Sequence, residues 1–458
     1  MRFESKPIAE HDEVPTADDG RWDALIHHWD ARQPRPHDAH AQQNACYVVS
    51  VTTSTDAIAR RAQLDEILGL VGAQRDKVMG HETRYVPYPD PRTLLGHGAC
   101  AAIAQEAANC GADLLVIDAE LSPSQMRNLE DATGLAVSCR EAVILNVFQQ
   151  HARTARARIQ VEIAHLAYLR PRIRGIGLTM DQQAGGVMGS RGPGETASAM
   201  LARRLDRRMA ELRRDLVRLQ RAAAVQRKGR EGCLQISLVG YTNAGKTTLM
   251  NALTGANLSA KDVPFETLDT TSRCLTRHGG DILVSDTVGV IRRLPERLMG
   301  SFESTLAVVE EASLLVLVVD VSDPEWELHL RITEDLLVRL GVEGVPRFYV
   351  FNKVDKIPEP PLAGILLNRS HGHPFMALSC EDTQATAALR HTLIAEARRG
   401  FKRERVFVEY DATGLLDRVY AQCRVVHTRA TDRGLRLIVE GPSHVVASIK
   451  AAGQAVTQ

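Results

Sequence analysis

The residues that point most directly to chemistry form the stretch Gly240–Thr248, which reads GYTNAGKTT. Its first eight residues match the phosphate-loop pattern G-x-x-x-x-G-K-[ST] at every position. A buried-strand pattern, LQISLV, precedes it, and a helical pattern, TLMNALTG, follows. In that context backbone N–H groups surround phosphate oxygens, and the helix N-terminus adds its dipole. We therefore expect Lys246 to reach the β- and γ-phosphates of a nucleotide and Thr247 to ligate Mg²⁺. The expected nucleotide contacts are Gly240, Tyr241, Thr242, Asn243, Ala244, Gly245, Lys246, Thr247 and Thr248.

A second motif, D-x-x-G, ends the strand pattern ILVSD and comprises Asp286, Thr287, Val288 and Gly289. A carboxylate at the end of that strand can hold Mg²⁺ through water, and we expect this outer-shell role for Asp286. The N–H of Gly289 is expected to meet the γ-phosphate.

The third motif, N-K-x-D, follows the strand pattern RFYVF and comprises Asn352, Lys353, Val354 and Asp355. Guanine offers a ring N–H and an exocyclic amine to one carboxylate, so Asp355 is expected to select GTP over ATP. Asn352 and Lys353 then brace the base. Downstream, Ser379, Cys380 and Glu381 follow another strand pattern, where a loop can close over the base.

The polar stretch between the phosphate loop and Asp286 is expected to be a mobile switch. It contains Phe265, Glu266, Thr267, Leu268 and Asp269. Thr267 can complete the Mg²⁺ shell and sense the γ-phosphate. The alternative is an ordinary loop threonine. The expected catalytic residues are thus Lys246, Thr267 and Gly289, and the expected metal-associated residues are Thr247, Thr267 and Asp286.

Val290 occupies the position after Gly289, where many small GTPases carry the glutamine that orients the attacking water. Valine cannot hydrogen-bond water, so intrinsic hydrolysis is expected to be slow and a partner to supply or order the missing groups. Asn243 is a candidate ligand for a monovalent cation, K⁺, near the phosphates.

The elements that must position these motifs alternate between strand and helix patterns over residues 231–400, which predicts a doubly wound α/β domain. Residues 46–142 show a similar alternation, with strands expected at Tyr47–Val51 and Leu114–Asp118 and helices at Asp56–Val71 and Ala99–Asn109. Residues 401–458 read β-α-β-β-α and predict a small α+β domain. Residues 1–45 have the polar composition of a disordered tail.

Residues 143–230 predict an antiparallel helical hairpin. Apolar residues recur at steps of three or four from Phe148 to Leu169, in a stretch free of Gly and Pro that starts at Ala142, and again from Leu201 to Leu219. Between them lies AGGVMGSRGPGE, residues 184–195, which lacks a Lys-Ser/Thr ending and a preceding buried strand. It is therefore interpreted as a glycine-rich tip and not as a second phosphate loop.

The hairpin is basic although the whole chain is neutral. Residues 203–230 contain eleven Lys or Arg against three acidic residues, whereas the chain has 56 of each sign. A polyanion-binding surface is the favoured interpretation, and a solvated helix face is the alternative. The candidate RNA contacts are Arg191, Arg203, Arg204, Arg207, Arg208, Arg213 and Arg214.

Composition excludes several other classes of protein. The eight cysteines show no close pairs, so neither a disulfide framework nor a zinc site is expected. No apolar segment is long enough to cross a bilayer. We expect a monomer in the cytoplasm, with some of it peripheral at the membrane.

Several segments together resemble the HflX family of translational GTPases, in matching order and over roughly residues 58–455. They include PDPRTLLGHG, GADLLVIDAELSPSQMRNLE, QVEIAHLAYLRPRI, GSRGPGET, TLDTTSR and SDTVGVIRRLP. The resemblance implies an N-terminal α/β subdomain, a long helical hairpin, a G domain that binds GTP with Mg²⁺, and a small C-terminal domain. It also implies binding to the large ribosomal subunit and its RNA, with the tip near the peptidyl-transferase centre, and GTP-driven ribosome rescue or splitting under heat stress.

The chain departs from the family pattern at a few positions. Val290 replaces the usual Phe, Glu266 and Thr270 replace Ala and Pro, and Thr247-Thr248 replaces Ser-Thr. ASAMLARRLDRR follows GPGET where the family continues with Leu-Glu, and GHGAC lacks the usual Lys. Two other functions stay open: a GTP-regulated protein-interaction switch built from residues 46–230, and an RNA remodeller without ribosome specificity.

Overall fold

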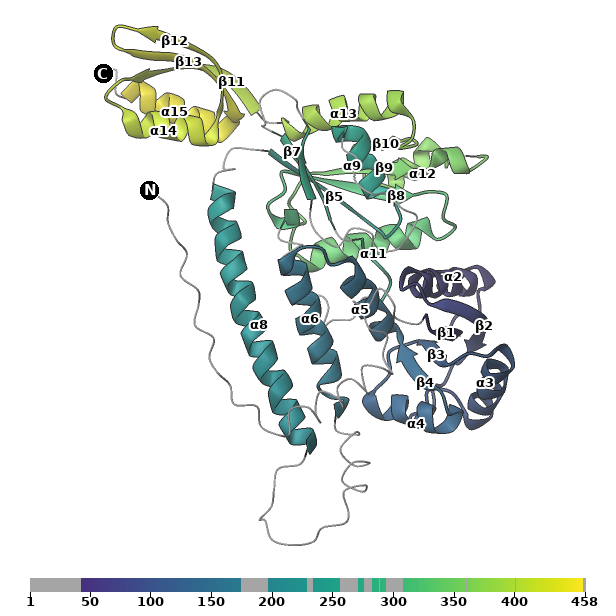
Figure 1. Ribbon diagram of the computed structural model, residues 1–458. Coiled ribbons are helices and arrows are strands. Elements are labelled where there is room, and N and C mark those ends of the chain that lie inside the picture. Colours follow the sequence, from purple (N-terminus) through teal and green to yellow (C-terminus); the bar gives the residue numbers. More distant parts are fainter. Residues whose placement is uncertain are drawn as a thin grey trace, which may run out of the picture.

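The structure is a computed structural model that describes residues 43–173, 197–228, 234–255, 271–275, 282–287, 289–293, 308–359, 361–399 and 401–455. Its order of elements confirms the predicted fold class: an α/β region, a helical hairpin, a doubly wound α/β sheet and a small α+β region follow one another along the chain (Figure 1).

The N-terminal region is a four-stranded parallel sheet in the order β2-β1-β3-β4. Its elements are β1 (Ala45–Thr52), α2 (Ala57–Ala73), β2 (Lys77–Tyr85), α3 (His97–Cys110), β3 (Leu114–Asp118), α4 (Pro123–Thr133) and β4 (Ala136–Cys139). Asp56 caps α2 by accepting from the N–H of Ile58, and Ser122 with Gln125 forms a capping box at α4. Both predicted strands and both predicted helices are confirmed here.

The interpretation of the apolar pattern from Phe148 to Leu169 as a single helix was wrong. The structure has α5 (Arg140–His151) and α6 (Ala155–Leu169), with Ala152 in an extended conformation between them. Thr154 accepts a hydrogen bond from the N–H of Ala157 at 3.2 Å and so starts a second helix. Apolar spacing alone does not reveal this cap. The threonine hydroxyl accepts from a backbone N–H, and this bond leaves the apolar pattern around it unchanged.

The hairpin pairs α6 with α8 (Ala197–Lys228), which lie side by side in Figure 1. Ion pairs of Arg170 with Asp206 and of Arg208 with Glu162, each at 2.9 Å, link the two sides of the hairpin. The apolar seam between the helices includes Met209 and Leu212, which belong to the pattern from Leu201 to Leu219 and are buried. The glycine-rich tip and Arg191 lie outside the described residues.

The nucleotide-loop region is a six-stranded sheet in the order β10-β9-β8-β5-β7-β6, parallel except for β6. Its strands are β5 (Leu234–Gly240), β6 (Thr271–Cys274), β7 (Ile282–Asp286), β8 (Leu314–Asp320), β9 (Arg347–Asn352) and β10 (Phe375–Ala377). Helices among the described residues of this region include α9 (Lys246–Thr254), α11 (Trp326–Arg339), the short 3₁₀ helix η2 (Val354–Lys356), α12 (Ala363–Arg369) and α13 (Thr383–Ala397).

Both faces of this sheet are covered, which is why its strands read as continuous apolar runs. In β8, Leu314, Val316 and Val318 belong to the core that includes α9 and α13. The alternate residues Leu315 and Leu317 belong to a second core, which also includes α11 and the N-terminal region. The sheet and the N-terminal region therefore share continuous apolar packing.

The C-terminal region has the predicted β-α-β-β-α order. Its elements are β11 (Phe401–Glu409), α14 (Thr413–Gln422), β12 (Arg424–Thr431), β13 (Gly434–Pro442) and α15 (Ser443–Ala455), with an antiparallel sheet in the order β11-β13-β12. It has a core of its own, to which Val408, Val419, Leu437 and Ile449 contribute. None of the helices within the described residues is long and apolar enough to cross a membrane.

Candidate nucleotide-binding site

The phosphate loop connects β5 to α9 and has a left-handed backbone at two positions. Asn243 has φ 61° and Gly245 has φ 94°. A Cβ on Gly245 would collide with the side-chain amide of Asn352, so this position requires glycine for both conformation and space. The loop thus turns tightly and leads directly into the N-terminus of α9, which starts at Lys246.

Lys246 lies beneath this loop and is buried. Its Nζ donates to the carbonyl oxygens of Gly240, at 3.1 Å, and Tyr241, at 2.8 Å. Burial lowers the pKa of Lys246 to about 8, and the carboxylate of Asp286 opposes that shift. The negative charge of bound phosphates would stabilise the charged form of this buried lysine.

Thr247 and Asp286 come from different elements and meet at the loop. The Thr247 Oγ1 donates to Oδ2 of Asp286 at 2.8 Å, and Asp286 is fully buried at the end of β7. A hydroxyl and a carboxylate are the hard oxygen groups that Mg²⁺ prefers. The two side chains therefore fit the predicted inner-shell and outer-shell metal roles. Among the described residues, no cluster of three or more His, Cys, Asp or Glu offers another metal site.

The residues after Asp286 are fixed to the phosphate loop. The buried Thr287 hydroxyl donates to the carbonyl of Leu238 at 2.6 Å, so this side chain anchors to β5. A Cβ on Gly289 would come within 3.3 Å of the Lys246 Nζ and closer still to Thr242, which shows how near its backbone lies to the loop. The structure thus brings the D-x-x-G glycine and the phosphate-loop lysine together.

Val290 continues this contact through its backbone. Its N–H donates to the carbonyl of Gly240 at 3.0 Å, and its carbonyl accepts from the N–H of Thr242 at 2.7 Å. The valine side chain is buried in the apolar core shared with the N-terminal region. It is therefore turned away from solvent, in addition to lacking a polar atom.

The N-K-x-D motif is joined to the phosphate loop by side-chain hydrogen bonds. The Asn352 Nδ2 donates to the carbonyl of Ala244 at 2.9 Å, and its Oδ1 accepts from the N–H of Cys380 at 3.0 Å. The Lys353 Nζ donates to the carbonyl of Asn243 at 2.8 Å. Three segments distant in sequence thus meet at one edge of the sheet.

Asp355 lies exposed in η2. Ser379 accepts from the N–H of Glu381 at 3.4 Å, which shapes the loop that follows β10. Asp320, at the end of β8, pairs with Lys353 at 2.7 Å and was not foreseen from sequence. Its position at a strand end, like that of Asp286, is the signal that could have found it. Phe265, Glu266, Thr267, Leu268, Asp269 and Val288 lie outside the described residues.

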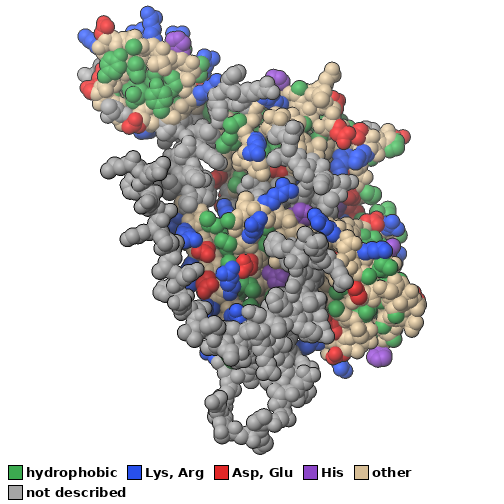
Figure 2. All heavy atoms as spheres, in the orientation of Figure 1, with side chains coloured by type: hydrophobic (Ala, Val, Ile, Leu, Met, Phe, Trp, Pro, Cys, Tyr) green, Lys and Arg blue, Asp and Glu red, His purple; other side chains and the backbone are tan. Residues whose placement is uncertain are grey.

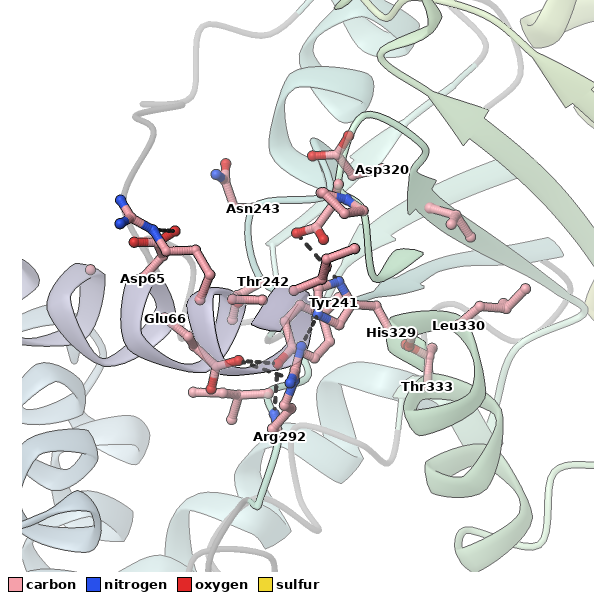
Figure 3. A pocket seen from close by; sticks show the side chains of 18 of the residues that line it. Asp65, Glu66, Tyr241, Thr242, Asn243, Arg292, Asp320, His329, Leu330 and Thr333 are labelled. Atoms are coloured by element: carbon pink, nitrogen blue, oxygen red, sulfur yellow. Dashed lines mark hydrogen bonds and ion pairs between the residues drawn. The ribbon is translucent and has the colours of Figure 1, made fainter. Parts of the chain in front are cut away.

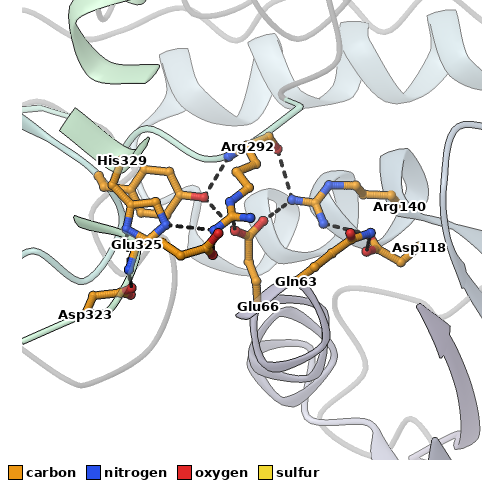
Figure 4. A network of polar contacts seen from close by, with 9 residues as sticks. Gln63, Glu66, Asp118, Arg140, Arg292, Asp323, Glu325 and His329 are labelled. Carbon is orange, nitrogen blue, oxygen red and sulfur yellow. Dashed lines mark hydrogen bonds and ion pairs between the residues drawn. The ribbon is translucent and has the colours of Figure 1, made fainter. Parts of the chain in front are cut away.

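A cavity of about 620 Å³ borders the outer side of the phosphate loop, between α2 and the start of α11 (Figure 3). Glu66, Tyr241, Arg292 and His329 contribute to its lining and to a polar network shown in Figure 4. No sequence motif indicated this network, because its members come from separate regions and share no spacing.

A doubly wound sheet with a phosphate loop, a strand-end D-x-x-G and an N-K-x-D joined to that loop defines the class of P-loop GTPases. Family models match along the chain in the same order: one described as "GTP-binding GTPase N-terminal" over residues 61–149, one as "GTP-binding GTPase Middle Region" over residues 151–230, and one as "50S ribosome-binding GTPase" over residues 235–353.

Relatives named GTPase HflX match over most of the chain. That of Spirochaeta thermophila is 35% identical over 402 residues, covering 87% of this chain and 97% of its own. That of Gluconacetobacter diazotrophicus is 41% identical over 341 residues, covering 74% of each chain. A solved GTP-binding protein from Sulfolobus solfataricus in complex with GDP aligns with 78% of this chain and 99% of its own, at 22% identity and a TM-score of 0.43. The chain belongs to the HflX family of GTPases, and it binds and hydrolyses GTP.

Proposed function

We propose that this GTPase associates with the large ribosomal subunit through α8 and uses GTP hydrolysis to rescue or split ribosomes under stress. The observation that carries the proposal is the line of exposed arginines on a long helix of a GTPase. Arg203, Arg204, Arg207, Arg208, Arg213 and Arg214 are all exposed. Figure 2 shows Lys and Arg side chains on the visible face of the molecule, with Asp and Glu side chains among them.

Along its sequence α8 carries many more basic than acidic residues. Its three acidic residues, Asp206, Glu211 and Asp215, each lie within ion-pair distance of an arginine. The remaining arginines leave the helix strongly positive, and at 1.5 Å per residue its 32 residues extend for about 48 Å. A rigid basic rod of that length suits contact with several phosphates of folded RNA.

The name of one matching family model, "50S ribosome-binding GTPase", supports the same partner. Cosedimentation with purified large subunits tests the association, with free ribosomal RNA and small subunits as comparisons. Pelleting with large subunits in the presence of a non-hydrolysable GTP analogue supports the proposal. Equal pelleting with any RNA favours a general RNA remodeller, and no pelleting favours a protein-interaction switch.

Within the nucleotide site we propose that Lys246 binds the β- and γ-phosphates and that the N–H of Gly289 meets the γ-phosphate. When Mg²⁺ is bound it neutralises phosphate charge, and Thr247 and Asp286 are the described side chains that would hold it. Thr267, also proposed for the metal shell, lies outside the described residues. Lys246→Ala should abolish nucleotide binding, and retained hydrolysis would contradict the assignment.

We propose a monovalent-cation role for Asn243. Its side chain is exposed at the turn of the phosphate loop, and its backbone is fixed by Lys353. K⁺ placed there would add the positive charge that a missing catalytic group leaves out. Turnover should be faster in KCl than in NaCl at equal ionic strength, and equal rates would remove the cation from the account.

A further inference from the structure

We propose that Glu66 and Arg140, two residues of the N-terminal region, are positioning residues for GTP hydrolysis. Glu66 acts through Tyr241, and Arg140 acts directly, on the segment that follows Gly289. The inference deepens the proposed role of Gly289 and rests on it. It concerns hydrolysis by the protein alone and is independent of any ribosome.

The backbone N–H and the backbone carbonyl of Arg292, three residues after Gly289, each form a hydrogen bond with a side chain, that of Tyr241 and that of Arg140 respectively. Its N–H donates to the hydroxyl of Tyr241 at 2.9 Å. Its carbonyl oxygen accepts from Nη2 of Arg140, on α5, at 2.9 Å. One polypeptide segment of the nucleotide site thus depends on a side chain of the phosphate loop and on a side chain from outside the G domain.

Glu66, on α2, joins these two contacts. The Tyr241 hydroxyl donates to Oε2 of Glu66 at 2.5 Å, and Nη2 of Arg140 donates to Oε1 of the same carboxylate. Figure 4 shows Glu66 between the two arginines, Arg140 and Arg292. The tyrosine hydroxyl can donate to a carboxylate and accept from an amide at once, which is why it suits this position.

Arg140 is itself held firmly on the side of the N-terminal region. It is 3% exposed, and its Nη1 donates to the fully buried Asp118 at 2.7 Å. Gln63 donates to the other oxygen of Asp118 at 2.8 Å. Buried charges with several fixed partners have little freedom to reorient, so they transmit the position of α2 and α5 to Arg292.

Residues of the G domain hold the side chains of Tyr241 and Arg292 in place. The ring of His329 stacks on that of Tyr241 with centroids 3.8 Å apart and planes within 8°. Arg292 is ion-paired with Glu325, and its Nε lies 3.6 Å from Oε2 of Glu66. In Figure 3 Tyr241, Arg292 and His329 lie beside the cavity between α2 and the phosphate loop.

These contacts restrain Gly289 through the residues that follow it in the chain. Val290 is bonded to the phosphate loop, and Arg292 is bonded to Tyr241 and Arg140, so the segment has little freedom to shift. Hydrolysis requires placement of the γ-phosphate partner within a fraction of an ångström, and small displacements slow reactions severely. Loss of the Glu66 or Tyr241 contact should therefore slow the chemical step more than it weakens nucleotide binding.

The test compares Tyr241→Phe, Glu66→Ala and Glu66→Gln with a matched control, Tyr349→Phe. The hydroxyl of Tyr349 donates to Glu334 at 2.8 Å on the same sheet, away from Gly289, so the control removes the same kind of bond. We expect Tyr241→Phe and Glu66→Ala to lower kcat about tenfold with GDP affinity within about twofold of the native value. Tyr349→Phe should retain the native kcat.

Two further results make the test specific. Glu66→Gln retains an acceptor for the tyrosine hydroxyl, so its kcat should exceed that of Glu66→Ala. The double variant Tyr241→Phe/Glu66→Ala should be no slower than the slower single variant, because both act through one chain of contacts. Amide exchange at Arg292 should be faster in Tyr241→Phe than in Tyr349→Phe.

The inference is overturned if Tyr241→Phe hydrolyses GTP as fast as Tyr349→Phe, or if its kcat falls while exchange at Arg292 stays native. The role of Gly289 is tested separately by Gly289→Ala. Native hydrolysis by that variant would remove the proposed γ-phosphate contact, whatever the Tyr241 and Glu66 variants show.

Discussion

The side-chain amide of Asn352 donates a hydrogen bond to the carbonyl oxygen of Ala244, 2.9 Å away and 108 positions earlier in the chain. The same side chain accepts from the N–H of Cys380. One buried residue thus joins the phosphate loop, the end of β9 and the loop after β10. Nucleotide affinity and stability of the G domain should therefore depend together on Asn352.

Asn352→Ala leaves a buried carbonyl and a buried N–H without their partners. Each such loss costs about 1–3 kcal/mol, so we expect a lower unfolding midpoint and at least tenfold weaker binding of GDP. Urea unfolding and fluorescence titration with a labelled nucleotide measure the two effects. Lys356→Ala, an exposed change in the same loop, is the control. Native GDP affinity in Asn352→Ala would refute the bracing role.

Asp355→Asn tests which base the site reads. Guanine presents two N–H groups to a carboxylate, whereas xanthine presents a carbonyl that an amide can satisfy. The variant should lose affinity for GTP and gain affinity for XTP, with preference reversed in a competition assay. Unaltered selectivity would mean that Asp355 does not contact the base. Because the side chain is exposed, the thermal midpoint should hardly change.

His329 should make stability depend on pH. Burial lowers the pKa of His329, and Arg292 lowers it further against the opposing effect of Asp323. Below pH 6.5 the unfolded chain therefore binds more protons than the folded chain at this site, so the stability that the neutral ring contributes is lost as pH falls. His329→Gln removes the titrating group.

Urea unfolding at pH 7.5 and pH 5.5 measures this difference. The native protein should lose more stability between the two values than His329→Gln does. Equal losses would show that His329 keeps its ordinary pKa in the folded protein.

The exposed arginines of α8 can be tested without breaking the hairpin. Arg208 pairs with Glu162 across the two helices, so its reversal would also remove a contact of the hairpin. The triple reversal Arg207→Glu, Arg213→Glu and Arg214→Glu avoids that pair. It should lower the affinity for large subunits, measured by cosedimentation, by about 10³-fold or more. The salt dependence of that affinity should become flatter.

The matched control reverses three exposed arginines on other helices, Arg127, Arg331 and Arg339. That variant should pellet like the native protein. Equal weakening by both variants would assign the effect to net charge and not to α8.

Sequence predicted the parts of the fold that local patterns encode. Buried strands such as Leu314–Asp320 read as apolar runs, and the phosphate-loop spacing identified Lys246 and Thr247, which the structure places beside Asp286. Strand β6 was missed, because Thr271–Cys274 is a polar, half-exposed edge strand without an apolar run. The break between α5 and α6 was missed because Thr154 interrupts a pattern that remains apolar on both sides.

The network around Tyr241 could not be predicted from spacing at all. Glu66, Arg140 and Arg292 lie in three separate segments, and each alone reads as an ordinary charged residue. Only the packing of α2 against the phosphate loop gives them a shared role. Tertiary ion pairs of this kind carry no local signal, so the structure is needed to find them.

Steady-state GTP turnover with and without purified large ribosomal subunits tests the central claim most directly. Because Val290 supplies no group to orient water, we expect slow turnover by the protein alone and strong stimulation by large subunits. Free ribosomal RNA should stimulate much less, and the α8 triple reversal should abolish the stimulation. Turnover that large subunits leave unchanged would contradict the account.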